Sequence, residues 1–238
     1  MNKLKKEYCL KLVWLGVVAL QCVLAQSVYA DVENPDPWES VNRITHGFND
    51  GIDRAVLKPV AKAYKNVVPG GVRQTIGRFF SNLDEFGNVA NNLLQGKAKY
   101  AMGSAGRLMI NTTVGLGGLL DPATDMGLLA HPEDFSQTFR VWGVPNGPYL
   151  VIPFLGPSTV TDAASLPLDS VVGPLRDYHP VRHRNTLRGV DLVDGRASVL
   201  GAESVVFGDR YIFFRDAYLQ RQNYLAKDGQ VVDEFDDF

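Results

Sequence analysis

The feature that most constrains this chain is an apolar stretch between Leu108 and Pro157 that glycine and proline interrupt repeatedly. A helix that crosses a bilayer needs about 20 unbroken apolar residues, and no part of this stretch supplies them. The stretch nevertheless holds more Leu, Val and Met than a solvated loop would. This pattern predicts a surface that contacts lipid without a membrane-spanning helix.

The N-terminus has the composition of an export signal. It contains a lysine-rich start, an apolar run from Leu12 to Ala25 that is shorter than a membrane span, and small residues for a signal peptidase at Val28-Tyr29-Ala30. We expect cleavage before Asp31, with Ala25 as the alternative site. The expected organisation is a signal peptide at 1–30, one helical domain at 31–225 and an acidic tail at 226–238.

Charge and cysteine content narrow the possible classes of protein. Residues 1–30 hold four Lys and one Glu, so 20 basic and 25 acidic residues remain of the 24 and 26 in the whole chain, a net charge of −5. Nucleic-acid binding is therefore not expected. Cys9 and Cys22 both lie in the expected signal peptide, which leaves the mature chain without a disulfide. Cys22 could accept a lipid, but Gln21 stands where such a signal has Gly or Ala, so plain cleavage is favoured and a lipid anchor stays open.

Apolar residues recur at helical spacing through most of the chain, which predicts an all-α fold in a single domain. Helices are expected at about 38–52, 59–67, 72–83 continuing to 96, 97–111, 132–142, 157–171, 192–206 and 209–225. Met109 to Ala130 is expected to form a helical hairpin or a bent loop. Tyr149 to Ile152 is the best strand signal, but it is short and bounded by prolines, so no sheet is expected.

No pattern typical of catalysis or metal binding stands out, so we expect no enzyme activity, no cofactor and no metal. His179 and His183 have the spacing of helical ligands, but Pro180 follows the first of them, and a surface pair is the better interpretation. Ser104 and Ser158 lie outside any G-x-S-x-G motif. Four aspartates lack the calcium-loop pattern and fit helix caps and turns instead: Asp121, Asp125, Asp162 and Asp169.

Aromatic and basic side chains allow further expectations. Trp38 fits the core, whereas Trp142 and Tyr149 bracket the apolar loops and fit a membrane–water boundary. For three basic residues the sequence leaves two interpretations open, contact with lipid phosphates or a solvated helix face: Lys99, Arg107 and Arg140.

A series of short motifs between about residues 36 and 180 resembles the MlaA (VacJ) family in identity and order. The motifs are Asp36-Pro37-Trp38-Glu39-Ser40-Val41-Asn42-Arg43, Phe48-Asn49, Lys58-Pro59-Val60-Ala61, Asn82-Leu83, Asn91 with Leu93-Leu94-Gln95-Gly96, Arg107, Asn111-Thr112-Thr113-Val114-Gly115, Gly117-Gly118-Leu119-Leu120-Asp121, Gly143-Val144, Gly147-Pro148-Tyr149 and Pro153-Phe154-Leu155-Gly156-Pro157-Ser158. The segment from Arg215 to Arg221 also resembles a C-terminal motif of the family.

The resemblance implies a ring of amphipathic helices in the inner leaflet of the outer membrane, embedded from the periplasmic face, with a central amphipathic channel. It implies intermembrane phospholipid transport, in which phospholipid mislocalised to the outer leaflet is removed and outer-membrane lipid asymmetry is maintained. The implied partners are phospholipid, a trimeric outer-membrane porin and a periplasmic lipid-carrier protein. Members of the family are commonly lipoproteins, and the segment before Cys22 departs from that pattern.

The resemblance also suggests site residues. Phe48 and Asn49 match a family segment near the channel, so they are candidates for gating, the alternative being that Phe48 is core and Asn49 a cap. A glycine-broken segment is a candidate for a flexible loop beside the opening: Val114, Gly115, Leu116, Gly117, Gly118, Leu119 and Leu120. A third set is expected to shape the ring or its periplasmic exit: Gly147, Pro148, Tyr149, Pro153, Phe154 and Gly156.

Two other functions compete with lipid transport. Exposed apolar loops could equally belong to a structural or adhesion factor of the cell envelope that binds a protein partner. A lipid hydrolase is a weaker alternative, because the sequence lacks a recognisable nucleophile–base arrangement.

Overall fold

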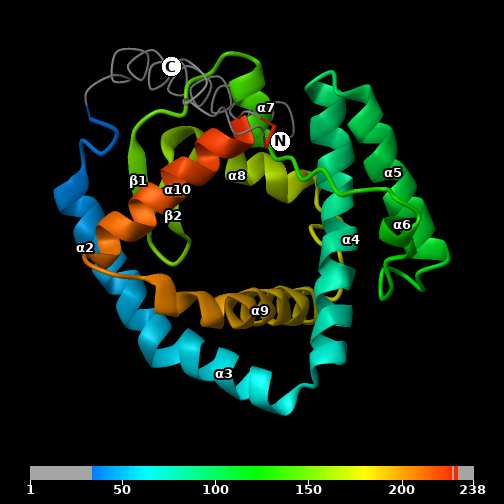
Figure 1. The fold of residues 1–238 in the computed structure, drawn as a ribbon, viewed down its shortest axis with the longest axis horizontal. Coiled ribbons are helices and arrows are strands. Elements are labelled where there is room, and N and C mark those ends of the chain that lie inside the picture. The colour runs from blue at the N-terminus through cyan, green and yellow to red at the C-terminus, as the bar shows by residue number, and fades with distance from the viewer. Residues whose placement is uncertain (1–33, 227, 230–238) are drawn as a thin grey trace, which may run out of the picture.

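The computed structural model describes residues 34–226 and 228–229, and its helices are arranged as a ring (Figure 1). The elements in chain order are α2 (Glu39–Ile52), the π-helical turn η1 (Asp53–Leu57), α3 (Lys58–Val67), α4 (Gly70–Leu94), α5 (Ala98–Thr113), α6 (Pro122–Asp125), α7 (Phe135–Val141), β1 (Tyr149–Ile152), β2 (Gly156–Thr159), α8 (Val160–Val172), α9 (Val181–Ser198), the 3-10 turn η2 (Val199–Val205) and α10 (Arg210–Ala226). The expected signal peptide at 1–30 and most of the expected acidic tail lie outside the described residues.

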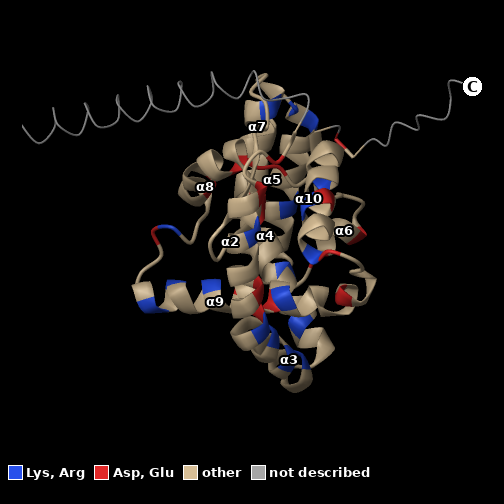
Figure 2. Ribbon diagram, turned by 90° about the vertical axis from the view of Figure 1, so that its left-hand side faces the viewer, with Lys and Arg blue, Asp and Glu red and all other residues tan. Residues whose placement is uncertain are grey.

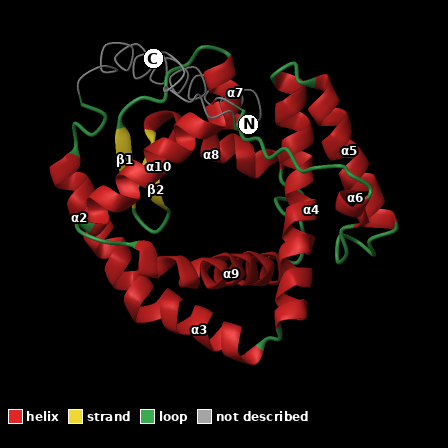
Figure 3. Ribbon diagram, in the orientation of Figure 1, coloured by secondary structure: helices red, strands yellow, loops and turns green. Residues whose placement is uncertain are grey.

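The ring is closed by contacts between segments that are distant in sequence. Helices α2 and α3 form one side and α4 the opposite side, while α9 packs against both α3 and α4. The strands together with α7, α8 and α10 complete the ring, and α5 packs along the outer side of α4 (Figure 1). Figure 3 shows that helices dominate and that the described strands form one small sheet. The predicted all-α class and the single domain are confirmed.

The first side of the ring is one continuous helical segment from Glu39 to Val67, not two helices separated at Pro59 as expected. The chain passes from α2 into α3 through the π-helical turn η1, where the Lys58 N–H donates to the Asp53 carbonyl. Proline in a regular α-helix clashes with the carbonyl four residues earlier. We attribute the tolerance of Pro59 to this local widening, which regular helical periodicity does not reveal.

The strand prediction was wrong, because β1 and β2 form an antiparallel hairpin in which Tyr149 faces Thr159 and Ile152 faces Gly156. Phe154 and Gly156 turn the chain with φ values of 65° and 91°. Pro157 and Ser158 therefore lie in a strand and do not open α8. That helix begins at Val160, and the Thr159 side chain accepts a hydrogen bond from the Asp162 N–H at its start.

Two other helix boundaries differ from the expectation. Helix α7 begins at Phe135, because the carboxylate of Asp134 caps it by accepting from the Gln137 N–H at 2.8 Å. Helix α9 begins at Val181, eleven residues before the expected start. It ends at Ser198, and the rest of the expected helix forms the 3-10 turn η2. Three arginines interrupt the apolar pattern of its first turns, namely Arg182, Arg184 and Arg188.

The ring reverses the usual distribution of polar and apolar side chains. Along α4 and α5 the fully or nearly fully buried residues are mainly polar: Asn82, Glu85, Asn88, Asn91, Asn92, Ser104, Arg107 and Asn111. Large apolar residues are exposed on every side, including Ile44 and Phe48 of α2, Met102 and Met109 of α5, and Leu116 and Leu129 after it. A small apolar core of Tyr149, Val151 and Tyr211 lies between the hairpin and α10.

Charged residues are unevenly distributed over the ring. Lysine and arginine are frequent on α3 and α9 (Figure 2). None of the helices in the described part of the chain has the length and apolar character needed to cross a membrane.

Candidate functional site

Two asparagines of α2 hold the hairpin by its outer edge. Asn42 and Asn49 are seven residues apart, which is about two helical turns, so both face β1. The Asn42 amide donates to the Tyr149 carbonyl at 3.1 Å and accepts from the Val151 N–H at 2.9 Å. Asn49 donates to the Ile152 carbonyl at 2.9 Å and accepts from the Phe154 N–H at 2.8 Å. These amides replace the missing neighbouring strand, which explains why so short a strand is stable.

Residues of two separately predicted sets meet at the hairpin turn. The rings of Phe48 and Phe154 pack edge to face with centroids 5.3 Å apart, next to the Asn49 hydrogen bonds. Phe48 is 48% exposed and Asn49 lies within α2. The alternative interpretation of Phe48 as core and Asn49 as a helix cap is therefore wrong.

The membrane-boundary prediction fails for Tyr149, which is only 1% exposed and packs against Tyr211 and Tyr218. Its position in β1 turns its ring inward under α10. Trp38 was expected in the core but is 47% exposed, because it precedes the first turn of α2 and faces outward. Trp142 is 55% exposed, and its Nε1 donates to the Leu94 carbonyl.

Gly147 and Pro148 directly precede β1, in the loop that leads from α7 into the hairpin. The carbonyl of Pro148 accepts from the Val160 N–H at 3.1 Å, which ties the entry of β1 to the start of α8. The predicted exit residues therefore lie together around one hairpin, and Phe154 lies at its tip.

The glycine-broken segment from Val114 to Leu120 is a compact turn at the end of α5. The N–H groups of Gly117 and Gly118 donate to the carbonyls of Thr112 and Asn111, and Leu120 donates to Gly115. A Cβ on Gly115 would lie 2.4 Å from the Asn111 carbonyl oxygen, so only glycine fits there. The apolar side chains of this segment point outward, with Val114 and Leu116 both 68% exposed. Whether the segment moves stays a prediction.

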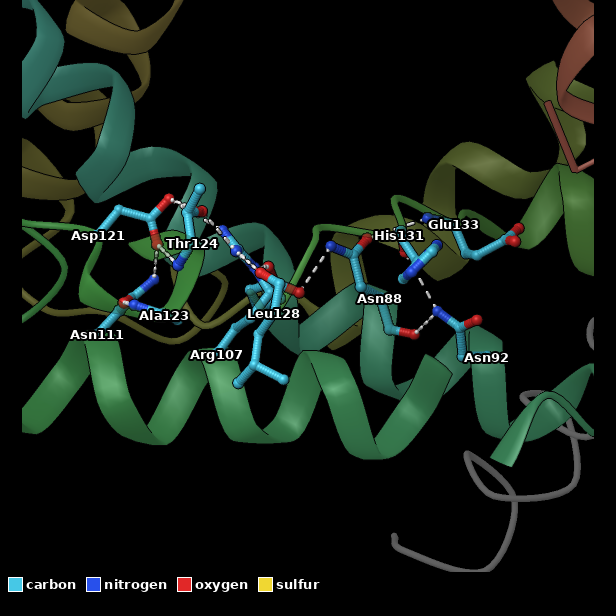
Figure 4. Close-up of polar contacts among 11 residues, drawn as sticks. Asn88, Asn92, Arg107, Asn111, Asp121, Ala123, Thr124, Leu128, His131 and Glu133 are labelled. Atoms are coloured by element: carbon cyan, nitrogen blue, oxygen red, sulfur yellow. Dashed lines mark hydrogen bonds and ion pairs between the residues drawn. The ribbon is translucent and has the colours of Figure 1, made fainter. Parts of the chain in front are cut away.

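A buried ion pair anchors the segment from Asp121 to Leu128, and Figure 4 shows Arg107 beside this segment. Arg107 on α5 binds Glu85 on α4 with Nε and Oε1 2.6 Å apart, and both side chains are almost inaccessible. Arg107 also donates to Thr124 Oγ1 at 2.9 Å and to the Leu128 carbonyl, and it contacts Asp121 at 3.2 Å. Neither interpretation of Arg107 from the sequence was right, because this side chain faces neither lipid nor solvent.

Asp121 joins the same network from the start of α6. Burial alone would raise the pKa of its carboxyl, but hydrogen bonds from Thr124 and Asn111 and the charge of Arg107 outweigh it and lower the pKa to about 2. The carboxylate therefore stays ionised and holds α6 against α5.

Asparagines of α4 hold the segment that crosses from α6 to α7. Asn88 accepts from the Glu133 N–H at 3.0 Å, and Asn92 donates to the His131 carbonyl at 3.2 Å (Figure 4). Asn91 accepts from the Thr138 hydroxyl at 2.8 Å. None of these three asparagines is among the site residues predicted from the sequence. Their helical spacing on one face of α4 was the available signal.

Cavities lined by both polar and apolar side chains follow one another along α4. A cavity of 360 Å³ between α4, α7, α8 and α9 includes Asp84, Asn88 and Asp169 in its lining. A cavity of 290 Å³ between α4 and α5 shares Asp84 and Asn88 with it. A third of 320 Å³ shares Arg78 with the second and is also lined by Val114 and Leu120. This arrangement can bind a polar group beside an exposed apolar surface.

Comparisons with known proteins agree with this architecture. Residues 34–225 match the family described as MlaA lipoprotein. The intermembrane phospholipid transport system lipoprotein MlaA of Escherichia coli K12 is 31% identical over 215 residues, covering 82% of this chain and 80% of that protein. The Haemophilus influenzae protein of the same name is 32% identical over 207 residues, covering 84% and 83%.

Two further similarities differ in how much of the other protein they span. An uncharacterised protein of Rickettsia felis is 37% identical over 144 residues, which cover 60% of this chain and only 57% of that protein. A solved structure from work on the structural basis for maintenance of bacterial outer membrane lipid asymmetry superposes with a TM-score of 0.71 and 32% identity, covering 80% of this chain and 98% of that one. Because the family match includes nearly all of the described residues, this chain belongs to the MlaA lipoprotein family.

Proposed function

We propose that this protein is an outer-membrane component of intermembrane phospholipid transport. It removes phospholipid mislocalised to the outer leaflet through an amphipathic channel and passes it to a periplasmic carrier, which maintains lipid asymmetry. The observation that carries this proposal is the reversed distribution of side chains, with polar residues buried along α4 and α5 and large apolar residues exposed around the ring.

This distribution suits a ring that lies within one leaflet. Exposed apolar side chains lose nothing in contact with acyl chains, whereas in water so large an apolar surface would favour aggregation. Helices satisfy their own backbone hydrogen bonds, which lipid cannot do. A phospholipid headgroup is costly to transfer through an apolar medium, and the polar and charged side chains that line the cavities along α4 reduce that cost.

Position and partners follow from the family and remain part of the proposal. The ring lies in the inner leaflet, is reached from the periplasmic face and associates with a trimeric porin. Phe48, Asn49 and Phe154 act at the gate, and the segment from Val114 to Leu120 lies beside the opening. The transport step needs no covalent chemistry. Ser104 does not support a hydrolase, because its side chain is fully buried.

The test measures phospholipid exposed on the surface of cells that lack the gene and are complemented with wild type or variants. Phe154→Ala removes the ring contact with Phe48, and we expect it to change outer-leaflet phospholipid at normal protein abundance. Phe207→Ala is the matched control, because Phe207 is 79% exposed and packs edge to face on Phe213 at 5.9 Å.

The same experiment separates the competing functions. Accumulation of outer-leaflet phospholipid in the null strain, reversed by wild type, is expected for transport. If surface phospholipid does not change in the null strain, transport is rejected and a structural or adhesion role is favoured. A purified protein that releases free fatty acid from phospholipid would instead favour a hydrolase.

A further inference from the structure

The 290 Å³ cavity between α4 and α5 has an unusual charge pattern. Its acidic and basic lining residues include Glu85, Arg107 and Asp121, which pair with one another in the buried network described above and leave a net charge of −1. Arg78 and Asp84 also line it, and within the described part of the chain neither has an ion-pair partner. The cavity therefore offers one available cation and one available anion.

These two charges lie in a definite order along α4. They are six positions apart, which corresponds to about 9 Å along the helix axis. Arg78 also lines the 320 Å³ cavity beside the exposed Val114 and Leu120. Asp84 lies further along and also lines the 360 Å³ cavity. An apolar surface, a cation and an anion thus follow one another.

A phospholipid with an amine headgroup presents the matching order of acyl chain, phosphate and ammonium. We propose that this cavity binds the phosphoethanolamine headgroup, with the Arg78 guanidinium on the phosphate and the Asp84 carboxylate on the primary ammonium. The acyl chains lie over Val114 and Leu120. This inference rests on the proposed function and adds a preference for a zwitterionic lipid over an anionic one.

The electrostatics around Asp84 agree with a cationic ligand. Partial burial, together with the nearby carboxylates of Asp191 and Glu85, raises the pKa of Asp84 to about 6. Its carboxyl is still mainly ionised at neutral pH, and an ammonium group there would relieve the repulsion. A glycerol headgroup has no positive charge to do so, and its net negative charge would face these carboxylates.

The test is native mass spectrometry of the purified full-length protein in micelles that contain equal amounts of dioleoyl phosphatidylethanolamine and dioleoyl phosphatidylglycerol. We expect wild type to retain the ethanolamine lipid preferentially. Asp84→Asn should reduce the ratio of ethanolamine to glycerol lipid about tenfold, the usual effect of losing a hydrogen bond between charged groups. Arg78→Gln should weaken retention of both lipids, because both contain the phosphate.

Matched controls keep the result specific. Asp125→Asn changes a carboxylate that lines the neighbouring 320 Å³ cavity, and Asp177→Asn changes one that is 92% exposed. Neither should alter the lipid ratio. If Asp125→Asn changes the ratio and Asp84→Asn does not, the assignment is wrong. Each variant must have a circular dichroism spectrum like that of wild type. Asp84→Glu, which keeps the carboxylate, should retain the preference for the ethanolamine lipid.

Further outcomes distinguish a failure of the headgroup proposal from a failure of the transport proposal. Soluble glycerophosphoethanolamine, added at a concentration at which the lipid itself would saturate the site, should not displace the lipid. Displacement would mean that the cavity binds the free headgroup without a contribution from the acyl chains, which would overturn the assignment to a lipid. Equal retention of both lipids by wild type overturns the headgroup preference and leaves transport intact. Retention of neither lipid, with no change of surface phospholipid in the null strain, rejects the proposed function itself.

Discussion

Replacing Arg107 with methionine should destabilise the protein strongly, because the change leaves Glu85 charged and buried. The two side chains are 6% and 2% exposed, so water cannot compensate for the missing partner. Breaking a buried ion pair from one side costs about 3–5 kcal/mol. For a chain of this length, each kcal/mol lowers the melting temperature by about 2–4 °C, which predicts a decrease of about 6–20 °C.

The measurement is thermal unfolding followed by circular dichroism in detergent micelles. Arg182→Met, an exposed position on α9, should leave the melting temperature within about 2 °C. Adding Glu85→Gln to Arg107→Met removes the buried charge and keeps an acceptor for the Asn88 amide, which donates to Glu85 at 3.0 Å. The double variant should recover at least half of the loss. A single variant that melts within about 2 °C of wild type would refute the reasoning.

Three further changes test other parts of the ring. Asn42→Ala should lower the free energy of unfolding by about 2 kcal/mol in chemical denaturation, because the Val151 N–H loses its acceptor; Asn185→Ala on exposed α9 is its control. Gly115→Ala should fail to accumulate as protease-resistant protein, because its Cβ would clash with the Asn111 carbonyl, whereas Gly103→Ala, with nothing within 4 Å, should accumulate normally. Hydrogen bonds from Lys58 and Arg196 lower the pKa of Glu203 from its ordinary 4.5 to about 2, so its stabilisation is present above pH 4.5 and is lost as the pH falls towards 2. Glu203→Gln should therefore flatten the decrease in stability over that range, and an unchanged decrease would contradict this assignment.

The helices could be predicted from the sequence because their apolar spacing is a local property. The boundaries near Glu39, Ala98 and Ala226 lie close to the expected ones. The hairpin could not be predicted, because four of the hydrogen bonds that stabilise β1 and the turn after it involve Asn42 and Asn49, which lie more than 100 residues earlier in the chain. A strand whose outer edge is satisfied by a distant helix carries no local signal of that support.

The candidate site was predictable to a similar extent. The motifs placed Phe48, Asn49 and Phe154 in candidate functional segments, and the structure adds that Phe154 contacts both Phe48 and Asn49. Tyr149 was assigned to the wrong environment, because a tyrosine next to an apolar loop fits a membrane boundary and a core equally well until its neighbours are known. The polar face of α4 was overlooked, because buried asparagines look like a solvated surface when only spacing is considered.

The sequence by itself determined the helical class, the family and the presence of an apolar surface too broken to span a bilayer, since each depends on local spacing or on motif order. Only the tertiary structure decided which side chains face inward. Arg107 of α5 and Glu85 of α4 are buried because the two helices pack along polar faces. Arg78 and Asp84, which also lie on α4, remain available at a cavity. The physical reason is that the fate of a charge depends on the partners and solvent around it, and those are set by chain segments far away in the sequence.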